Sequence, residues 1–378
     1  MKKTAYRPFR LFVFPTLLSV FILSVSPLHA KPEQTTLVPF KGNVEHVFFH
    51  PLIVNPSMAF LPGRRGDYMR DWFVTSYEFK EFLNEIYERG YVLVSLKSLF
   101  EEKNGKIIRK QLYFPAGKKP LILSVDDLNY YKTMQTHGVA KRLEIRGGKL
   151  FTVIDTPAGE QYLDNHEIIT IVDRFVKEHP DFSWNGAKGI IAPTGYKGVF
   201  GYNTVPSKKN TDCESERAKA ITIAEYLKKD GWEFASHGYW HLQENRCSYQ
   251  KLEKDITKWK AEVGSIVGPT NVHIYPFGDL IRKDMTKLDL MKNNGFKYFF
   301  GVTFVSSLKI NDDTVYGNRI PIDGKYLMGH VSGSRTLQFC DIKTVIDPKR
   351  VAVYGRNNKK KESPSKIQVS GKASDQVN

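Results

Sequence analysis

Two adjacent carboxylates, Asp126 and Asp127, follow an apolar run in the segment LILSVDDLNYY. Neighbouring like charges repel, and burying either carboxylate is costly unless a cation or hydrogen bonds compensate. One interpretation is a strand that ends in a polar turn, where Asp is a common residue. The other is that the pair performs chemistry together with a partner found elsewhere in the chain.

Two histidines four residues apart, His237 and His241, lie in the segment ASHGYWH. If the backbone turns helically after a strand, this spacing presents both rings on one side. Two neutral imidazoles and one carboxylate form a three-ligand set that suits zinc or a similar divalent cation, and they leave a position open for water. The second carboxylate is then free to take a proton from that water. Paired acids also hold magnesium in phosphoryl-transfer proteins, but that interpretation leaves the histidines unexplained.

The elements that must position these residues alternate between strand and helix. Strand patterns run into the Asp126 and His237 loops and into a third loop at Tyr275, and the clearest amphipathic helices are predicted over 75–89, 167–180 and 216–231. Such alternation across 44–305 is typical of an α/β fold with a largely parallel sheet, open or closed into a barrel. In these folds the loops at the carboxyl ends of the strands carry the site, so the three loops are expected to meet there.

The two ends of the chain are strongly basic, whereas its middle is not. The net charge of +16 divides into +4 for residues 1–30, +6 for residues 349–378 and +6 for all residues between them. A nucleic-acid-binding protein clusters basic residues within its fold, so nucleic acid is not an expected partner. Residues 1–10 are basic and residues 11–28 are apolar, and Ala30 offers a cleavage point, which predicts a signal peptide or membrane anchor and a secreted or cell-surface protein.

The domain organisation follows from these features. Residues 139–165 alternate polar and apolar around a Gly-Gly pair and predict an inserted β-hairpin. Cys213 and Cys247 are able to pair, which would leave Cys340 odd, although three small apolar side chains are the slightly preferred interpretation. The predicted segments are a signal peptide or anchor at 1–30, a linker at 31–43, one large domain at 44–348 and a basic, disordered tail at 349–378.

Three motifs in this order give the chain a resemblance to a known family. The segments SVDD, HGYWH and IYPFGD resemble the motifs of the polysaccharide deacetylases, the NodB-homology domain of carbohydrate esterase family 4. The resemblance covers roughly residues 44–305 and implies a distorted (β/α) barrel. It also implies that Asp127, His237 and His241 bind a divalent metal, most simply Zn²⁺ with Co²⁺ or Mn²⁺ as alternatives, and that Asp126 is the general base.

The remaining site residues are less complete matches to the family. Gly238 stands where the family has Ser or Thr, and the third motif lacks the arginine that often holds the catalytic acid, so His273 or a more distant arginine must take that place. His330, in the segment LMGH, fits the family's last motif as general acid, and His50 at the end of the first strand is the other candidate. Aromatic and proline residues beside the motifs are predicted to bind substrate: Tyr131, Trp240, Tyr275, Pro276 and Phe277.

The resemblance implies a metal-dependent hydrolase that removes N-acetyl or O-acetyl groups from an extracellular or cell-wall polysaccharide, such as a glycan that contains N-acetylglucosamine. The family mechanism places the metal and a backbone N–H near Tyr275 around the tetrahedral oxyanion. A catalytically inactive carbohydrate-binding or cell-wall protein on the same fold is the alternative, motivated by the missing arginine and the uncertain acid. The complete set of Asp126, Asp127, His237 and His241 argues against it.

Overall fold

The computed structural model describes residues 36–331 and 339–352. The segment predicted as a signal peptide or anchor, the first five residues of the predicted linker and the tail beyond residue 352 lie outside these residues. Within the described ranges, the helices are too short or too polar to cross a membrane.

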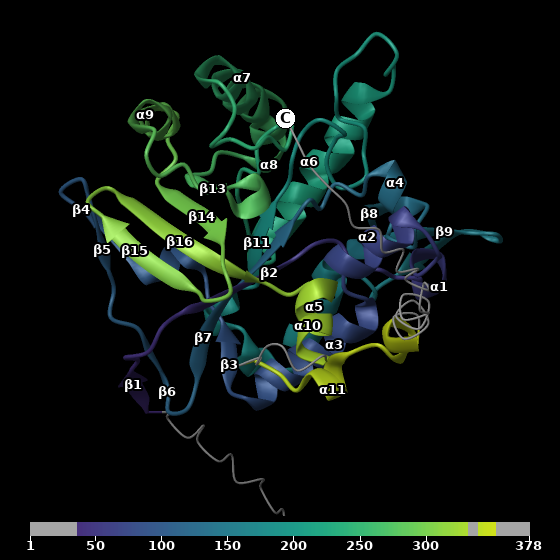
Figure 1. Ribbon diagram of the computed structural model, residues 1–378, viewed down its shortest axis with the longest axis horizontal. Coiled ribbons are helices and arrows are strands. Elements are labelled where there is room, and N and C mark those ends of the chain that lie inside the picture. The colour runs from purple at the N-terminus through teal and green to yellow at the C-terminus, as the bar shows by residue number, and fades with distance from the viewer. Residues whose placement is uncertain (1–35, 332–338, 353–378) are drawn as a thin grey trace, which may run out of the picture. The chain divides into compact units, whose positions relative to one another are not determined.

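A nine-stranded sheet forms the centre of the fold (Figure 1). Seven strands follow one another in the order β12-β11-β7-β2-β16-β14-β13, all paired in parallel, while β3 pairs with β7 and β15 pairs antiparallel with β16. The strands span Glu45–Phe49 (β2), Tyr91–Leu93 (β3), Lys119–Asp126 (β7), Gly189–Ala192 (β11), Trp232–Phe234 (β12), Val272–Ile274 (β13), Tyr298–Val302 (β14), Ser307–Asn311 (β15) and Thr314–Pro321 (β16). The parallel order agrees with the predicted α/β class.

The two ends of this strand order meet, and the sheet closes into a distorted barrel. Ser236, just after β12, forms a parallel bridge with His273 of β13. Its N–H donates to the Val272 carbonyl at 2.9 Å, and its carbonyl accepts from the Ile274 N–H at 2.8 Å. Because only this short stretch joins β12 to β13, the closure is narrow. The predicted distorted (β/α) barrel is therefore confirmed.

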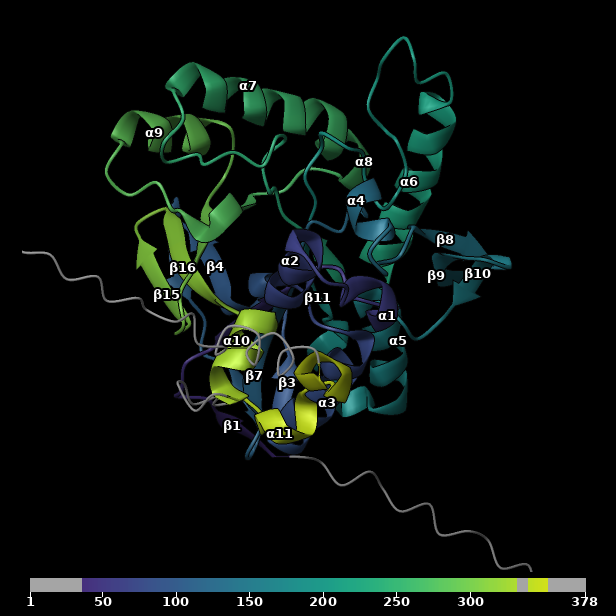
Figure 2. The ribbon, with the colours of Figure 1, turned by 45° about the vertical axis from the view of Figure 1, so that its right-hand side comes forward.

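The predicted helices surround the barrel. Over 75–89 the structure has α3, in which Thr75 and Glu78 form a capping box and the apolar face is buried. Figures 1 and 2 show α7 and α9 together on one side and α3, α10 and α11 on the opposite side. The helices span Pro56–Ala59 (α1), Arg64–Trp72 (α2), Ser76–Glu88 (α3), Lys132–Gln135 (α4), Ile168–Glu178 (α5), Cys213–Lys229 (α6), Tyr249–Trp259 (α7), Ser265–Val267 (α8), Met285–Asn293 (α9), Gly324–Val331 (α10) and Ile342–Val345 (α11).

Three small sheets lie outside the barrel. The segment predicted as a hairpin is a three-stranded antiparallel sheet in the order β10-β9-β8, seen at the edge of the molecule beside α6 in Figure 2. Its strands are Arg142–Arg146 (β8), Lys149–Thr156 (β9) and Gly159–Leu163 (β10), and the others are Leu37–Pro39 (β1) with Tyr113–Pro115 (β6) and Phe100–Lys103 (β4) with Lys106–Arg109 (β5). The turn between β8 and β9 falls at the Gly-Gly pair, as the alternation indicated.

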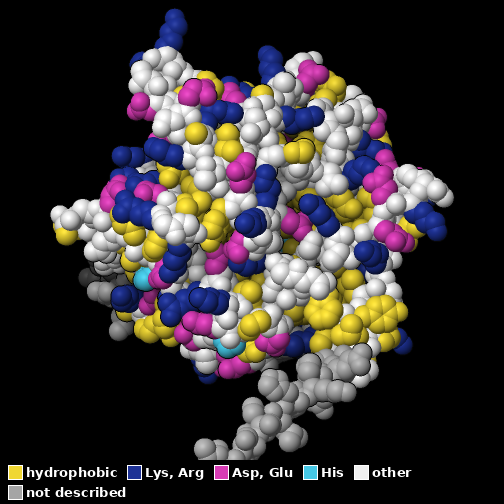
Figure 3. Space-filling model, turned by 180° about the vertical axis from the view of Figure 1, so that it is seen from behind, with side chains coloured by type: hydrophobic (Ala, Val, Ile, Leu, Met, Phe, Trp, Pro, Cys, Tyr) yellow, Lys and Arg dark blue, Asp and Glu magenta, His cyan; other side chains and the backbone are white. Residues whose placement is uncertain are grey.

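Two further observations bear on the sequence predictions. The predicted tail begins too early, because Arg350 is fully buried and donates two hydrogen bonds to Glu78, at 2.6 and 2.7 Å. Cys213, Cys247 and Cys340 are all free thiols. Figure 3 shows Lys and Arg side chains interspersed with Asp and Glu over the face that it views, rather than gathered into one basic surface.

Candidate metal centre

The four motif residues converge at the carboxyl ends of β7 and β12. Asp126 is the last residue of β7, and the histidines follow β12. Ligand atoms of Asp127, His237 and His241 all lie within 4.8 Å of one another. Both Asp127 (φ 56°) and His241 (φ 53°) adopt the left-handed conformation. That conformation is strained for residues other than glycine, and such strain is concentrated at functional sites.

His237 is held in the tautomer that a metal ligand needs. It is buried, and its Nδ1 lies 2.8 Å from the Ile274 carbonyl oxygen. A carbonyl only accepts, so Nδ1 carries the proton and Nε2 presents its lone pair to the centre. Burial lowers the pKa of His237, although the charges of Asp126 and Asp127 partly oppose this. A neutral ring with a free Nε2 is the ligand form of histidine.

The candidate oxygen ligand, the Asp127 carboxylate, is held by hydrogen bonds from two hydroxyl groups. Oδ1 of Asp127 accepts hydrogen bonds from the Tyr131 hydroxyl at 2.9 Å and from the Thr194 hydroxyl at 3.4 Å. Oδ2 lies 3.7 Å from Nε2 of His241, beyond hydrogen-bond distance. Ligand atoms on bonds of about 2.0–2.2 Å in a tetrahedral site lie roughly 3.3–3.6 Å apart. The donor set of two nitrogens and one oxygen therefore fits a divalent cation in type, with a spacing slightly wider than that of a closed site.

Asp126 has a different partner, the guanidinium of Arg319 on β16. Two parallel hydrogen bonds of 2.8 Å join them, and neither side chain is more than 4% exposed. Burial alone would raise the pKa of Asp126, but the charge and hydrogen bonds of Arg319, reinforced by the neighbouring His237 and His50, lower it to about 2. Asp126 is therefore ionised at neutral pH and beside the centre, 3.9 Å from Nε2 of His237.

Arg319 is the residue that sequence reasoning did not find. His273 does not take its place, because its ring is fully buried and lies 2.8 Å from Glu244. The available signal was an arginine inside the otherwise apolar end of a strand, in YGNRIPI (316–322), where only a buried anion would compensate its charge.

Comparison with known proteins agrees with this geometry. The family model for polysaccharide deacetylases matches residues 212–299, which include both histidines and the Tyr275 loop. Residues 212–299 therefore match part of a polysaccharide deacetylase domain. Asp126, Asp127 and Arg319 lie outside the matched segment, so only their geometry connects them to it.

Solved structures of deacetylases share little sequence with the chain. A polysaccharide deacetylase from Bacillus cereus is 13% identical, with 79% of this chain and 69% of that chain covered and a TM-score of 0.42. The Streptococcus pyogenes deacetylase PplD, in complex with acetate, is 15% identical, with 78% of this chain and 98% of that chain covered and a TM-score of 0.38. No functionally curated protein matches the chain.

Of the two predicted acid residues, His50 is the one whose side chain the structure describes. It follows β2, the strand beside β7, and its charge lowers the pKa values of Asp126 and of Asp323, the latter being raised overall by burial. The loop after His50 is held by Glu167, whose two carboxylate oxygens accept from the Leu52 N–H at 3.2 and 3.1 Å. His330 lies in α10, and its side chain is outside the described part of the structure.

The residues predicted to bind substrate fall into two groups. Trp240 and Phe277 are 41% and 62% exposed, and the Phe277 ring lies 4.5 Å from that of His241. Tyr275 is different: its side chain is fully buried, and its N–H donates to the Phe300 carbonyl at 2.9 Å. Neither its ring nor its N–H is available to substrate, which corrects that prediction, and Pro276 is buried as well. The Tyr131 hydroxyl donates to Asp127, so this side chain holds the candidate ligand rather than forming an exposed surface for substrate.

Two tyrosines near the centre carry no motif and were not predicted. Tyr68 of α2 and Tyr196 both have a pKa raised by burial and by the negative charge of Asp127. The Tyr196 ring lies 5.2 Å from that of Tyr131. Together with Trp240 and Phe277 they place aromatic surface around the candidate metal centre, and no local sequence signal links α2 to it.

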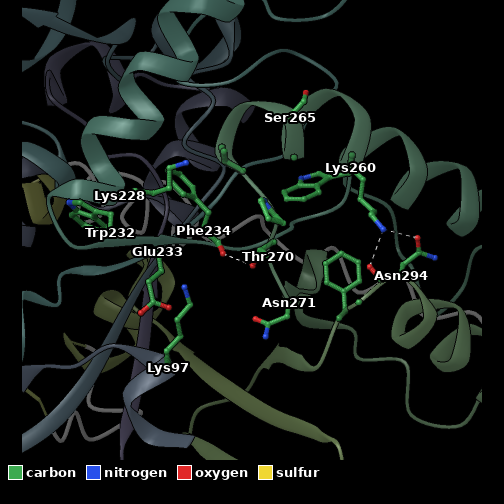
Figure 4. A pocket seen from close by; sticks show the side chains of 16 residues that line it. Lys97, Lys228, Trp232, Glu233, Phe234, Lys260, Ser265, Thr270, Asn271 and Asn294 are labelled. Carbon is green, nitrogen blue, oxygen red and sulfur yellow. Dashed lines mark hydrogen bonds between the residues drawn. The ribbon is translucent and has the colours of Figure 1, made fainter. Parts of the chain in front are cut away.

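A separate cavity of about 720 Å³ lies at the opposite, amino-terminal ends of β12 and β13 (Figure 4). Its lining contains no histidine, and its carboxylate, Glu233, accepts a hydrogen bond from Ser95. Lys260 donates to Asn294, and Thr270 donates to the Phe234 carbonyl at 2.7 Å. These contacts are local, and the cavity contains none of the motif residues, which lie at the carboxyl-terminal end of the barrel.

Proposed function

We propose that the protein is a metal-dependent hydrolase that removes N-acetyl or O-acetyl groups from an extracellular or cell-wall polysaccharide, with a glycan that contains N-acetylglucosamine as the expected substrate. The observation that carries this proposal is the convergence of ligand atoms of Asp127, His237 and His241 beside the ionised carboxylate of Asp126. The extracytoplasmic location rests on the composition of residues 1–30.

Asp127, His237 and His241 would hold the ion, with Zn²⁺ as the first expectation and Co²⁺ or Mn²⁺ as alternatives. A divalent ion there would polarise the acetyl carbonyl and make water acidic enough to react near neutral pH.

The chain's own residues divide the proton transfers between them. Asp126 takes a proton from the attacking water, and Arg319 keeps that carboxylate ionised and fixed in orientation. His50, at the end of β2, gives a proton to the departing amine, and its charge lowers the pKa values of both Asp126 and Asp323. Because the Tyr275 N–H is already bonded, a backbone donor to the oxyanion near Tyr275 has to be another N–H of that loop.

The exposed aromatic side chains supply the surface for the sugar. Flat rings such as Trp240 and Phe277 bury the apolar faces of pyranose rings, and the Phe277 ring lies directly against His241. A polymer lying across these rings would present one acetyl group at a time to the centre.

The test is acetate release by the full chain from peptidoglycan, chitooligosaccharides, poly-N-acetylglucosamine and acetylated xylan, with and without a chelator. We expect release from at least one N-acetylated glycan, loss on chelation, and about one bound divalent ion per chain. His241→Ala should lose both ion and activity, whereas His179→Gln, at the end of α5, should keep both. A wild-type protein that binds no divalent ion, with all four residues intact, would overturn the proposal in favour of a non-catalytic carbohydrate-binding protein.

A further inference from the structure

The loop that joins the two histidine ligands has no room for the residue that the family motif usually carries. Gly238 has φ of 67°, and a Cβ atom there would lie 2.9 Å from Oδ2 of Asp255 and 3.0 Å from Oε1 of Glu244. A serine or threonine would have to displace two buried carboxylates. The glycine therefore reflects what lies behind the loop.

Asp255, on α7, is the group behind the loop that touches it most directly. It is fully buried, its Oδ2 accepts from the Tyr239 N–H at 2.7 Å, and its Oδ1 accepts from the Trp240 N–H at 2.8 Å. Both donors belong to the short segment between His237 and His241. Hydrogen bonds to a carboxylate are shorter and stronger than neutral ones, and two from consecutive residues fix the direction of the backbone.

The segment that follows His241 is anchored independently of Asp255. Glu244, which also faces Gly238, lies 2.8 Å from Nε2 of the buried His273. The Lys287 ammonium donates to the carbonyls of Glu244 and Asn245, at 3.2 and 3.0 Å. The segment after His241 is therefore tied to β13 and α9, and it cannot follow the loop if the loop moves.

We propose that Asp255 is a positioning residue that holds the backbone of residues 239–240 so that His237 and His241 face the same ion. Asp255 holds the loop from behind, in place of the side-chain hydroxyl that the family motif has directly after the first histidine. This inference rests on the proposed function, because it concerns the same ion.

A purely structural role, in which Asp255 only attaches α7 to the barrel, makes a different prediction. It would lower the stability of the whole domain without changing the affinity of a folded chain for metal. Partners that orient metal ligands typically change metal affinity by about 10–100-fold when they are removed. Metal affinity, measured on folded protein, therefore separates the two roles.

The experiment compares Zn²⁺ and Co²⁺ binding by the wild type, Asp255→Asn, Asp255→Ala and the control Glu253→Gln, which alters an exposed carboxylate on the same helix. It is run at pH 8, because burial raises the pKa of Asp255 only to about 6. We expect both Asp255 variants to bind roughly 10–100-fold more weakly, with a lower kcat and a nearly unchanged KM at saturating metal. The control should match the wild type.

Asp255→Asn keeps the side-chain volume but turns an amide NH₂ toward one of the two N–H donors, so it tests the bonds and not a cavity. Wild-type affinity in folded Asp255→Asn would overturn the inference while leaving the proposed function intact. A wild type that binds no ion would overturn the proposed function first.

If both Asp255 variants fail to fold, two other measurements test whether Asp255 positions the loop. The wild-type amide protons of Tyr239 and Trp240 should exchange slowly in metal-free protein, and exchange as fast as in an open loop refutes the inference. Gly238→Ala, which pushes the loop off Asp255, should weaken metal binding comparably, and unchanged affinity refutes it as well.

Discussion

Replacing Arg319 with methionine tests the proposed base directly, because the change removes the partner of Asp126 and leaves its carboxylate in place. The pKa of Asp126 is about 2 against an ordinary value of 3.8. The difference corresponds to about 2.4 kcal/mol in favour of the ionised, folded state. This net value already includes the cost of burying the Asp126 carboxylate. Without Arg319 that cost would no longer be compensated. We therefore expect Arg319→Met to lose about 3–5 kcal/mol of the free energy of unfolding at pH 7.

The assay is urea unfolding in the presence of a chelator, since a bound ion would add its own stabilisation. Asp126→Asn and the double variant complete a thermodynamic cycle, in which the double variant should lose less than the two single variants together, by about 2 kcal/mol or more. Arg350→Met is the matched control, because Arg350 is equally buried and forms a similar bidentate pair with Glu78. It should lose comparable stability and keep the kcat/KM of the folded enzyme, whereas Arg319→Met should fall to the level of Asp126→Asn.

The pH dependence of the free energy of unfolding provides an independent test. A lowered carboxylate pKa contributes stability that is present above pH 3.8 and is lost as the pH falls toward 2. Without Arg319 the buried carboxylate prefers its proton, so the variant should become more stable as the pH falls from 7 toward 4. Strictly additive free energies in the cycle, or an Arg319→Met variant as stable as the wild type, would refute the argument that this pair holds the base.

Three further outcomes follow from the site. His50→Ala should lower kcat on an N-acetylated glycan by about 10²–10⁴-fold but spare hydrolysis of 4-nitrophenyl acetate, whose leaving group needs no proton; equal losses on both substrates would exclude the acid role. Asp126→Asn should keep the metal affinity of the wild type and lose turnover, and joint loss of both would mean that Asp126 is a ligand. Burial raises the pKa of Glu167 from 4.5 to about 8, so its contribution to stability is present below pH 4.5 and is lost as the pH rises through 8. Glu167→Gln should therefore gain on the wild type by roughly 3–5 kcal/mol between pH 4.5 and 9 in chemical unfolding, and a difference that stays constant with pH would contradict this.

Much of the barrel was predictable because its signals are local. The helix over 75–89 has a capping box and an apolar face within a few residues, and the structure begins and ends it within one residue of that range. The carboxyl ends of parallel strands meet at one end of a barrel, so strand assignment alone brought Asp127, His237 and His241 to the same place.

The partner of Asp126 was not predictable in this way. Arg319 is 193 residues away in the sequence and reaches β7 from β16, with β2 between the two strands. β16 interrupts its apolar residues with Gly317 and Asn318, so its pattern is weak, and nothing local connects its arginine to a particular acid. Gly238 is a similar case: the motif showed that a hydroxyl was absent, but only the packing of α7 behind the loop explains the glycine.

Asp126 and Asp127 can both be buried next to each other because the backbone directs their side chains to different partners. Asp126 continues the extended strand and meets Arg319, whereas Asp127 turns into the left-handed conformation and meets Tyr131 and His241. Had the strand continued, the two side chains would have pointed to opposite faces of the sheet and only one would have reached the centre. The turn costs of the order of 1–2 kcal/mol at a residue other than glycine. Glycine at 127 would remove that strain together with the oxygen ligand, so consecutive residues can serve as base and ligand only if the second one is strained.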